Sequence, residues 1–315
     1  MANELSRRGF LAASMAGAGL IASSAGAAAA PLEKKFQEGV SPWPLALNAS
    51  TIRPAAPMDK IEIAAVTGWD AIELWINDLE DLEKDGHNLK DVAKKIEDLG
   101  LFVPNIIGLW NCMPETPEAF EESLAATRER MRRSAEIGSH FVAAIPSPDR
   151  ADFDLKWGAE MYKRLLEIGR NDYGITVAFE FVGFLQGVHR IGQASAIAID
   201  ADDPGACLIC DTFHLYRGGS GFGGIKHLQP DFIANFHWND MPEDIPQFEG
   251  KDEHRIYPGD GFLPLEQVLR DLHAIGYKRT LSLELFVREL WEKDPRDVAA
   301  EGLRKMRENI AAAGV

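Results

Sequence analysis

Short apolar runs alternate with longer amphipathic segments along the chain after residue 40. Continuous apolar runs bounded by polar residues are typical of strands that are covered on both faces, as in a parallel sheet flanked by helices. Eight strands are predicted, at residues 45–51, 71–76, 101–107, 140–145, 175–181, 206–211, 232–238 and 280–286.

Helical spacing of apolar positions predicts helices between these strands, at residues 58–67, 88–99, 117–137, 155–170, 192–200, 264–275 and 296–312, with a weaker one near 224–229. Glycines that are typical of helix C-termini follow four of them: Gly68, Gly100, Gly138 and Gly276. Eight strand-then-helix units favour an α/β fold, a single-domain (β/α)8 TIM barrel over residues 31–315. A doubly wound open sheet is the alternative, but it would require a Gly-rich turn after the first strand, where this chain has Asn-Ala-Ser-Thr.

The first 30 residues differ from the rest of the chain. Arg7 and Arg8 precede an uncharged stretch of Ala, Gly and Ser, and Ala28 and Ala30 fit an A-x-A cleavage site. We interpret residues 1–30 as a twin-arginine signal peptide, which predicts a periplasmic or secreted protein. No later segment has 18 uncharged apolar residues, so we expect no membrane association after signal cleavage.

Composition and charge exclude several classes of function. The 315 residues are 46% hydrophobic and 26% charged, which is ordinary for a globular protein. A net charge of −16 would repel a phosphate backbone, so we expect no nucleic-acid partner. Three cysteines are too few for a scaffold built on disulfides.

Polar residues collect at the carboxyl ends of the last four predicted strands, where TIM-barrel enzymes place their active sites. Each of these strands carries one residue that can bind a metal, namely Glu180, Asp211, His237 and Glu284. Three carboxylates and one imidazole suit a single divalent cation such as Mn²⁺, Mg²⁺ or Co²⁺. Zn²⁺ is the alternative metal, although it more often recruits additional His or Cys.

These residues and their flanking segments resemble the sugar phosphate isomerase/epimerase family of xylose isomerase-like barrels. The resemblance covers roughly residues 45–290 and is carried by Phe-Glu-Phe at 179–181, Asp-Thr-Phe-His at 211–214, Phe-His-Trp-Asn-Asp at 236–240, Arg-Ile-Tyr-Pro-Gly-Asp-Gly at 255–261 and Ser-Leu-Glu at 282–284. It implies that the four residues above bind the metal. It also implies that Glu180 and Glu284 exchange protons with the substrate, and that His214 and Arg255 contact it.

Three further residues are candidate substrate contacts. Asn48 ends the first predicted strand, and Trp110 follows the third, where an aromatic face suits a sugar. Gln186 stands six residues after Glu180, where the ketose 3-epimerases of the family carry a second acid. This departure counts against a simple 3-epimerase.

The resemblance implies a small-molecule, sugar-like hydroxyketone as substrate. A metal that polarises the carbonyl and its neighbouring hydroxyl makes the adjacent C–H acidic, and a Glu base can then form an enediolate. Return of the proton gives an isomerase or epimerase, which is our first hypothesis. Loss of a β-leaving group gives a lyase or dehydratase acting on an inosose or a 3-keto sugar or glycoside. A third hypothesis is a non-catalytic sugar-binding protein. Barrels of this type often form homo-oligomers, although no segment of this chain marks an interface.

Three other patterns are given ordinary interpretations. Gly219, Gly221 and Gly224 match G-x-G-x-x-G but do not open a long helix after a strand, so we interpret them as a loop. Cys207 and Cys210 lie within one predicted strand and are interpreted as small buried hydrophobes. The acidic run 78–85 is interpreted as a solvated face.

Overall fold

The strands form a closed barrel. The computed structural model describes residues 36–315, so the predicted signal peptide at 1–30 lies outside the described residues. Eight parallel strands pair in sequence order, and the last pairs with the first. They are β1 (Leu45–Asn48), β2 (Ala71–Trp75), β3 (Asn105–Leu109), β4 (Phe141–Ala144), β5 (Thr176–Glu180), β6 (Leu208–Asp211), β7 (Ile233–Trp238) and β8 (Leu281–Leu283). The predicted TIM barrel is confirmed, and the open sheet is excluded.

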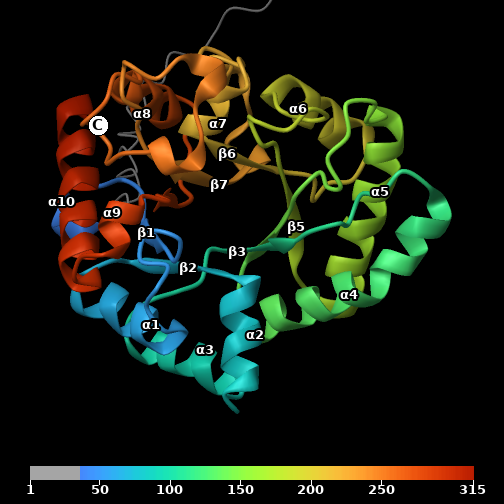
Figure 1. Cartoon of the computed structure of the whole chain (residues 1–315), viewed down its shortest axis with the longest axis horizontal. Coiled ribbons are helices and arrows are strands. Elements are labelled where there is room, and N and C mark those ends of the chain that lie inside the picture. The colour runs from blue at the N-terminus through green and yellow to red at the C-terminus, as the bar shows by residue number, and fades with distance from the viewer. Residues whose placement is uncertain (1–35) are drawn as a thin grey trace, which may run out of the picture. The chain divides into compact units, whose positions relative to one another are not determined.

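Helices surround the barrel, with the strands at its centre (Figure 1). The α-helices are α1 (Pro57–Val66), α2 (Ile76–Lys84), α3 (Leu89–Asp98), α4 (Pro117–Glu136), α5 (Leu155–Ile168), α6 (Ile191–Asp200), α7 (Thr212–Arg217), α8 (Leu265–Ala274), α9 (Arg288–Trp291) and α10 (Pro295–Ala313). The short 3-10 helices are η1 (Gln37–Gly39), η3 (Ile225–His227), η4 (Pro230–Phe232), η5 (Gln247–Glu249) and η6 (Asp252–His254), and η2 (Gly169–Tyr173) is a π-helix. No helix in residues 36–315 is long and apolar enough to cross a membrane.

Local sequence signals explain where several helices begin and end. The four glycines predicted at helix ends have φ values of +79° to +90°, a left-handed conformation that glycine adopts without strain. Asn88 and Asp154 cap the starts of α3 and α5 by accepting backbone N–H groups. Helices α2, α7 and α9 were not predicted, and each begins within a few residues of a strand end.

The acidic run 78–85 is not uniformly solvated, so that interpretation was wrong for its first residue. Asp78 is buried at the start of α2, where it accepts a hydrogen bond from the Trp75 backbone N–H. Its other oxygen lies 2.6 Å from Nζ of the equally buried Lys60. The pair ties α1 to α2 on the side of the barrel near Trp75.

Candidate metal centre

The carboxyl ends of β5 to β8 bring the four predicted metal ligands together inside the barrel. Nδ1 of His237 lies 3.2 Å from Oε1 of Glu180 and 3.3 Å from Oε2 of Glu284. It lies 3.6 Å from Oδ2 of Asp211. All four side chains are buried, and the donor atoms of Asp211, His237 and Glu284 lie within 4.8 Å of one another, as do those of Glu180, Asp211 and His214.

The donor set fits a divalent cation. Nδ1 of His237 is buried and has no hydrogen-bond partner in the described part of the chain, yet it faces three carboxylates. A lone pair in that position suits a metal ligand, and a cation would satisfy it together with the surrounding oxygens. Buried carboxylates also need compensating positive charge, and the Arg255 guanidinium alone does not balance three of them.

A fourth carboxylate, Glu73, lies beneath this cluster and was not predicted from the sequence. It is fully buried on β2 and is contacted by polar side chains from β1, β3, β7 and β8. Its oxygens are approached by five donors: Nδ2 of Asn48 at 2.9 Å, Nδ2 of Asn105 at 2.7 Å, Nδ2 of Asn235 at 2.9 Å, Nε2 of His237 at 3.1 Å and the hydroxyl of Ser282.

The Glu73 carboxylate determines which nitrogen of His237 is available to a metal. Because Glu73 can only accept, it keeps a proton on Nε2, so Nδ1, which faces the three acids, is the nitrogen at which a cation would take the place of a proton. The sequence signal was present, since Glu73 stands between Ile72 and Leu74 in an apolar strand. Glu73 lies two residues before the end of its strand, away from the strand ends at which candidate residues are predicted.

Arg255 is a buried cation within the cluster. Its Nη1 lies 2.7 Å from Oδ2 of Asp211 and 2.7 Å from Oε2 of Glu284, and its Nη2 lies 2.8 Å from Oδ1 of Asp252. Nε2 of His214 lies 3.3 Å from the same Nη2. Arg255 therefore orients two of the predicted ligands and one predicted substrate contact.

Burial and charge shift the ionisation of these groups. Burial alone would raise the pKa of Asp211, but the Arg255 guanidinium holds that pKa well below its usual range. Burial raises the pKa of Glu284 to about 8. Burial opposes the protonation of His237, yet the carboxylates of Glu284 and Glu73 hold its pKa well above the usual value. The cluster can therefore hold one proton-bearing and one ionised carboxyl group side by side.

A cavity of about 180 Å³ lies above the cluster, and we call it the inner cavity. Glu180, Glu284, His214, Arg255 and Trp110 line it, which places five of the predicted site residues around one space. Its remaining walls come from Trp75, Ile107, Ile145, Ser147, Val182, Phe184, Leu185, Asp252 and Phe286.

Two predicted substrate contacts lie elsewhere. Asn48 is fully buried and does not line the inner cavity; its amide donates to Glu73 and its Oδ1 accepts from Trp75 Nε1 at 2.9 Å. Gln186 is exposed, and its backbone N–H donates to Asp149 at 2.9 Å. In this arrangement Asn48 supports the cluster from below, and Gln186 belongs to a loop contact.

The long β7–α8 loop is held at its base by one carboxylate. Asp240 accepts hydrogen bonds from the backbone N–H groups of Met241, Gly259, Gly261 and Leu263. A Cβ on Gly261 would lie 2.2 Å from the Met241 carbonyl oxygen, so only glycine allows this close approach. The loop carries Arg255 into the cluster.

Residues 61–309 match the xylose isomerase-like TIM barrel family. The chain belongs to this family. Among curated relatives, inosose isomerase of Bacillus velezensis is 30% identical over 258 residues, which is 78% of this chain and 89% of that protein. The 3-dehydroshikimate dehydratase of Pseudomonas aeruginosa is 27% identical and matches 79% of this chain but 39% of its own length.

Solved structures of xylose isomerase-like barrels share the fold. The IOLI protein with a bound zinc atom superposes with a TM-score of 0.78 at 22% identity, covering 85% of this chain and 98% of that one. L-ribulose 3-epimerase superposes with a TM-score of 0.69 at 18% identity, covering 86% of this chain and 95% of that one. The curated relatives thus include isomerases and a dehydratase, and an epimerase shares the fold.

Proposed function

We propose that this protein is a divalent-metal-dependent isomerase or epimerase of a sugar-like hydroxyketone. The single observation that supports this most is that Glu180 and Glu284 meet at the floor of the inner cavity, each next to His237 Nδ1. Two acids around one small cavity are what proton removal and return at a carbon beside a carbonyl require. The inosose isomerase relatives add that a cyclic polyhydroxylated ketone is a suitable substrate class.

Each residue has a distinct task in this proposal. Glu180, Asp211, His237 and Glu284 would hold the cation, which when bound supplies polarisation of the substrate carbonyl and its neighbouring hydroxyl. One of the two Glu carboxylates removes the proton beside the carbonyl, and the same or the other Glu returns it. His214 and Arg255, which lie beside Asp211 and Glu284, orient substrate oxygens, while Trp110 and Trp75 on the facing wall exclude water from the reacting carbon.

A lyase or dehydratase is the second candidate, and one observation favours it. The 3-dehydroshikimate dehydratase relative is named for loss of water, and in this chain a Glu that has taken up the substrate proton can donate it to a departing β-hydroxyl or glycosidic oxygen. The chemistry up to proton removal is the same, so the product distinguishes the two candidates.

Proton NMR in D₂O tests the proposal. The protein would be incubated with free ketohexoses, an inosose and a 3-keto glycoside, with and without a chelator, and metal would be removed before spectra are recorded. We expect chelator-sensitive deuterium uptake beside the carbonyl. Glu180→Gln and Glu284→Gln should abolish it, whereas Glu122→Gln on the exposed face of α4 should not. Deuterium uptake that survives both active-site substitutions would refute the assignment, and tight sugar binding without uptake would favour a binding protein.

We also propose that the protein acts in the periplasm or outside the cell. The support is the sequence pattern of residues 1–30, with its paired Arg7 and Arg8. Fractionation of cells that express the native chain and an Arg7→Lys/Arg8→Lys variant tests it. We expect a processed protein in the periplasm only for the native chain.

A further inference from the structure

The inner cavity is small for a complete ligand site. Its volume of about 180 Å³ is below the range of roughly 300–1,000 Å³ that is usual for small-molecule sites. The cavity has room for the part of a substrate that reacts, and a larger substrate would have to extend beyond it. The surrounding surface has two larger hollows that share wall residues with the inner cavity.

The arrangement of the cluster determines on which side the substrate lies. All four predicted metal ligands lie at the carboxyl ends of β5 to β8, with Glu284 directly after β8. The opposite wall of the inner cavity comes from residues at the ends of β2, β3 and β4, including Trp75, Trp110 and Ile145. A ring that reaches Glu180 and Glu284 therefore has its remote side against the two tryptophans.

The first hollow, which we call the tryptophan-side pocket, adjoins that wall. Its volume is about 510 Å³, and Trp75 and Trp110 line both it and the inner cavity. The two rings stack with centroids 6.0 Å apart, and the Trp75 indole is fixed by its hydrogen bond to Asn48. Arg53 lies over the outer side of this group, with its Cζ 5.1 Å from the Trp75 ring centre and 5.4 Å from that of Phe286.

The polar groups of this pocket suit an uncharged, polyhydroxylated occupant. Lys60 and Asp78 neutralise each other at 2.6 Å, and exposed Arg53 and Asp81 carry one charge of each sign. Arg53 has no ion-pair partner within residues 36–315. The pocket is also lined by exposed Asn77 and by Ser50, whose buried Oγ has no hydrogen-bond partner in the same range. Planar polar side chains beside tryptophan rings are suited to sugar hydroxyls, which can both donate and accept.

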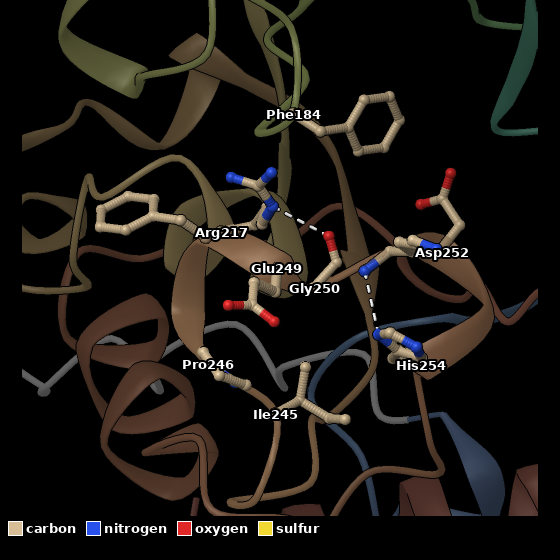
Figure 2. Close-up of a pocket in the computed structure, with 10 residues that line it drawn as sticks. Phe184, Arg217, Ile245, Pro246, Glu249, Gly250, Asp252 and His254 are labelled. Carbon is tan, nitrogen blue, oxygen red and sulfur yellow. Dashed lines mark hydrogen bonds between the residues drawn. The ribbon is translucent and has the colours of Figure 1, made fainter.

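In the second hollow, which we call the phenylalanine-side pocket, the polar groups bond to other groups of the protein. Figure 2 shows Arg217 donating to the Gly250 carbonyl. The Lys251 backbone N–H donates to Nδ1 of His254 at 3.2 Å. Asp252 is engaged by Arg255 at 2.8 Å. These groups hold the β7–α8 loop in place, so this pocket of about 610 Å³ serves as a comparison for the first.

We propose that the substrate is a keto sugar joined to a second, neutral sugar ring, as in a keto-disaccharide. The reacting ring occupies the inner cavity, and the second ring occupies the tryptophan-side pocket, where Arg53, Asn77 and Asp81 bind its hydroxyls. This inference rests on the function proposed above, and it narrows the substrate class from sugar-like hydroxyketones in general to keto-disaccharides.

The test compares two keto sugars that share the reacting ring, a methyl glycoside and the corresponding disaccharide, with metal-loaded protein. We expect kcat/KM to be at least roughly tenfold higher for the disaccharide, which corresponds to about 1.4 kcal/mol, the size of one hydrogen bond to a charged group. Arg53→Met keeps an aliphatic chain over the rings but removes the donors, so it should reduce this ratio to near one. Lys251→Met makes the same charge change in the phenylalanine-side pocket and should keep the wild-type ratio.

Binding measurements separate failure of this inference from failure of the proposed function. If neither compound is turned over, the proposed function fails, and calorimetric titration with the corresponding unoxidised disaccharide and methyl glycoside still tests the pocket. Tighter binding of the disaccharide that is lost in Arg53→Met supports the inference. Equal affinities, an equal effect of Lys251→Met, or a preference for a phosphorylated monosaccharide over the disaccharide would overturn it.

Discussion

Replacing Glu73 with Gln should weaken both the fold and the metal site, because this carboxylate is the common acceptor beneath the cluster. The substitution preserves shape but replaces one acceptor oxygen with an NH₂ group. Three donors converge on Oε1, from Asn105, Asn235 and His237, and two on Oε2, from Asn48 and Ser282. The Gln carbonyl should therefore take the Oε1 position and place its NH₂ group against Asn48 and Ser282.

The magnitude follows from which partners can adjust. The Ser282 hydroxyl can rotate and accept from the new NH₂ group. Asn48 cannot flip its amide, because its Oδ1 already accepts from Trp75 Nε1 and from the Ser50 backbone N–H. One buried donor then faces another, which costs about 1–3 kcal/mol of unfolding free energy. At about 2–4 °C per kcal/mol, the melting temperature should fall by several degrees.

The effect on metal binding has a separate cause. Nε2 of His237 would donate to a neutral carbonyl in place of a carboxylate, so the imidazole would be a less basic ligand. Loss of such an outer partner typically costs about 10–100-fold in metal affinity. Competition of the apoprotein with a chelating indicator for Zn²⁺ or Mn²⁺ would measure this dissociation constant.

Tyr162→Phe is the matched control. Its buried hydroxyl lies 2.9 Å from the carbonyl oxygens of Val177 and Cys207, away from the cluster, and its loss should lower stability without changing metal affinity. If Glu73→Gln and Tyr162→Phe leave the metal dissociation constant equally unchanged, Glu73 is only structural. An unchanged melting temperature for Glu73→Gln would refute the reasoning about its five donors.

Three other properties can be checked on the same protein. All three cysteines are buried, and burial raises the pKa of each thiol, to about 12 for Cys112 and Cys207. A thiol reagent should therefore label none of them until the protein unfolds, and labelling of the native protein would contradict this burial. Burial opposes ionisation of Glu83, but hydrogen bonds from Arg132 and Arg133 hold its pKa below 4.5, so Glu83→Gln should cost about 0.5–1 kcal/mol at pH 7. The pKa of Glu83 is lower in the folded than in the unfolded protein, so the stability difference between the native protein and Glu83→Gln should disappear as the pH falls below 4.5. Urea unfolding at a series of pH values measures this difference, and a difference that stays constant would count against the ion pairs. A Cβ at Gly218 would lie 1.9 Å from the His189 carbonyl oxygen, so Gly218→Ala should destabilise the protein by about 1–3 kcal/mol in thermal unfolding, whereas Gly223→Ala has open space and should not.

The eight strands and their order could be predicted because buried parallel strands leave a strong apolar signal. The predicted strand bounds were less accurate where a residue is buried by side-chain packing without pairing to a neighbouring strand. Leu101 and Val103 are buried like strand residues, but Pro104 cannot donate to a ladder, and β3 begins at Asn105. Helix α2 was missed because it has only nine residues and its buried Ile76, Leu79 and Leu82 stand among acids.

The candidate site was predictable to the extent that its residues lie at strand ends. The four predicted ligands, His214 and Arg255 are brought together, although Arg255 arrives from a loop whose path no local pattern specifies. The roles of Asn48 and Glu73 could not be predicted from strand position, because they depend on which side chains of other strands these residues contact inside the barrel. A useful signal is the recurrence of single polar residues in apolar strands: Asn48, Glu73, Asn105, Asn235 and Ser282.

The anchoring of the β7–α8 loop by Asp240 also bears on how this barrel can acquire new specificities. Since one carboxylate binds backbone N–H groups at both ends of the loop, and the contacts of Gly250, Lys251 and Asp252 fix its second half, closure of the loop does not depend on residues 242–249. Lengthening a loop whose ends are already fixed costs little, because the closure entropy grows only with the logarithm of its length. Residues 242–249 can therefore be exchanged or extended to reshape the phenylalanine-side pocket while Arg255 keeps its place. Because residues 242–249 can change while Arg255 stays in place, this loop is a suitable region for directed evolution of the enzyme's substrate range.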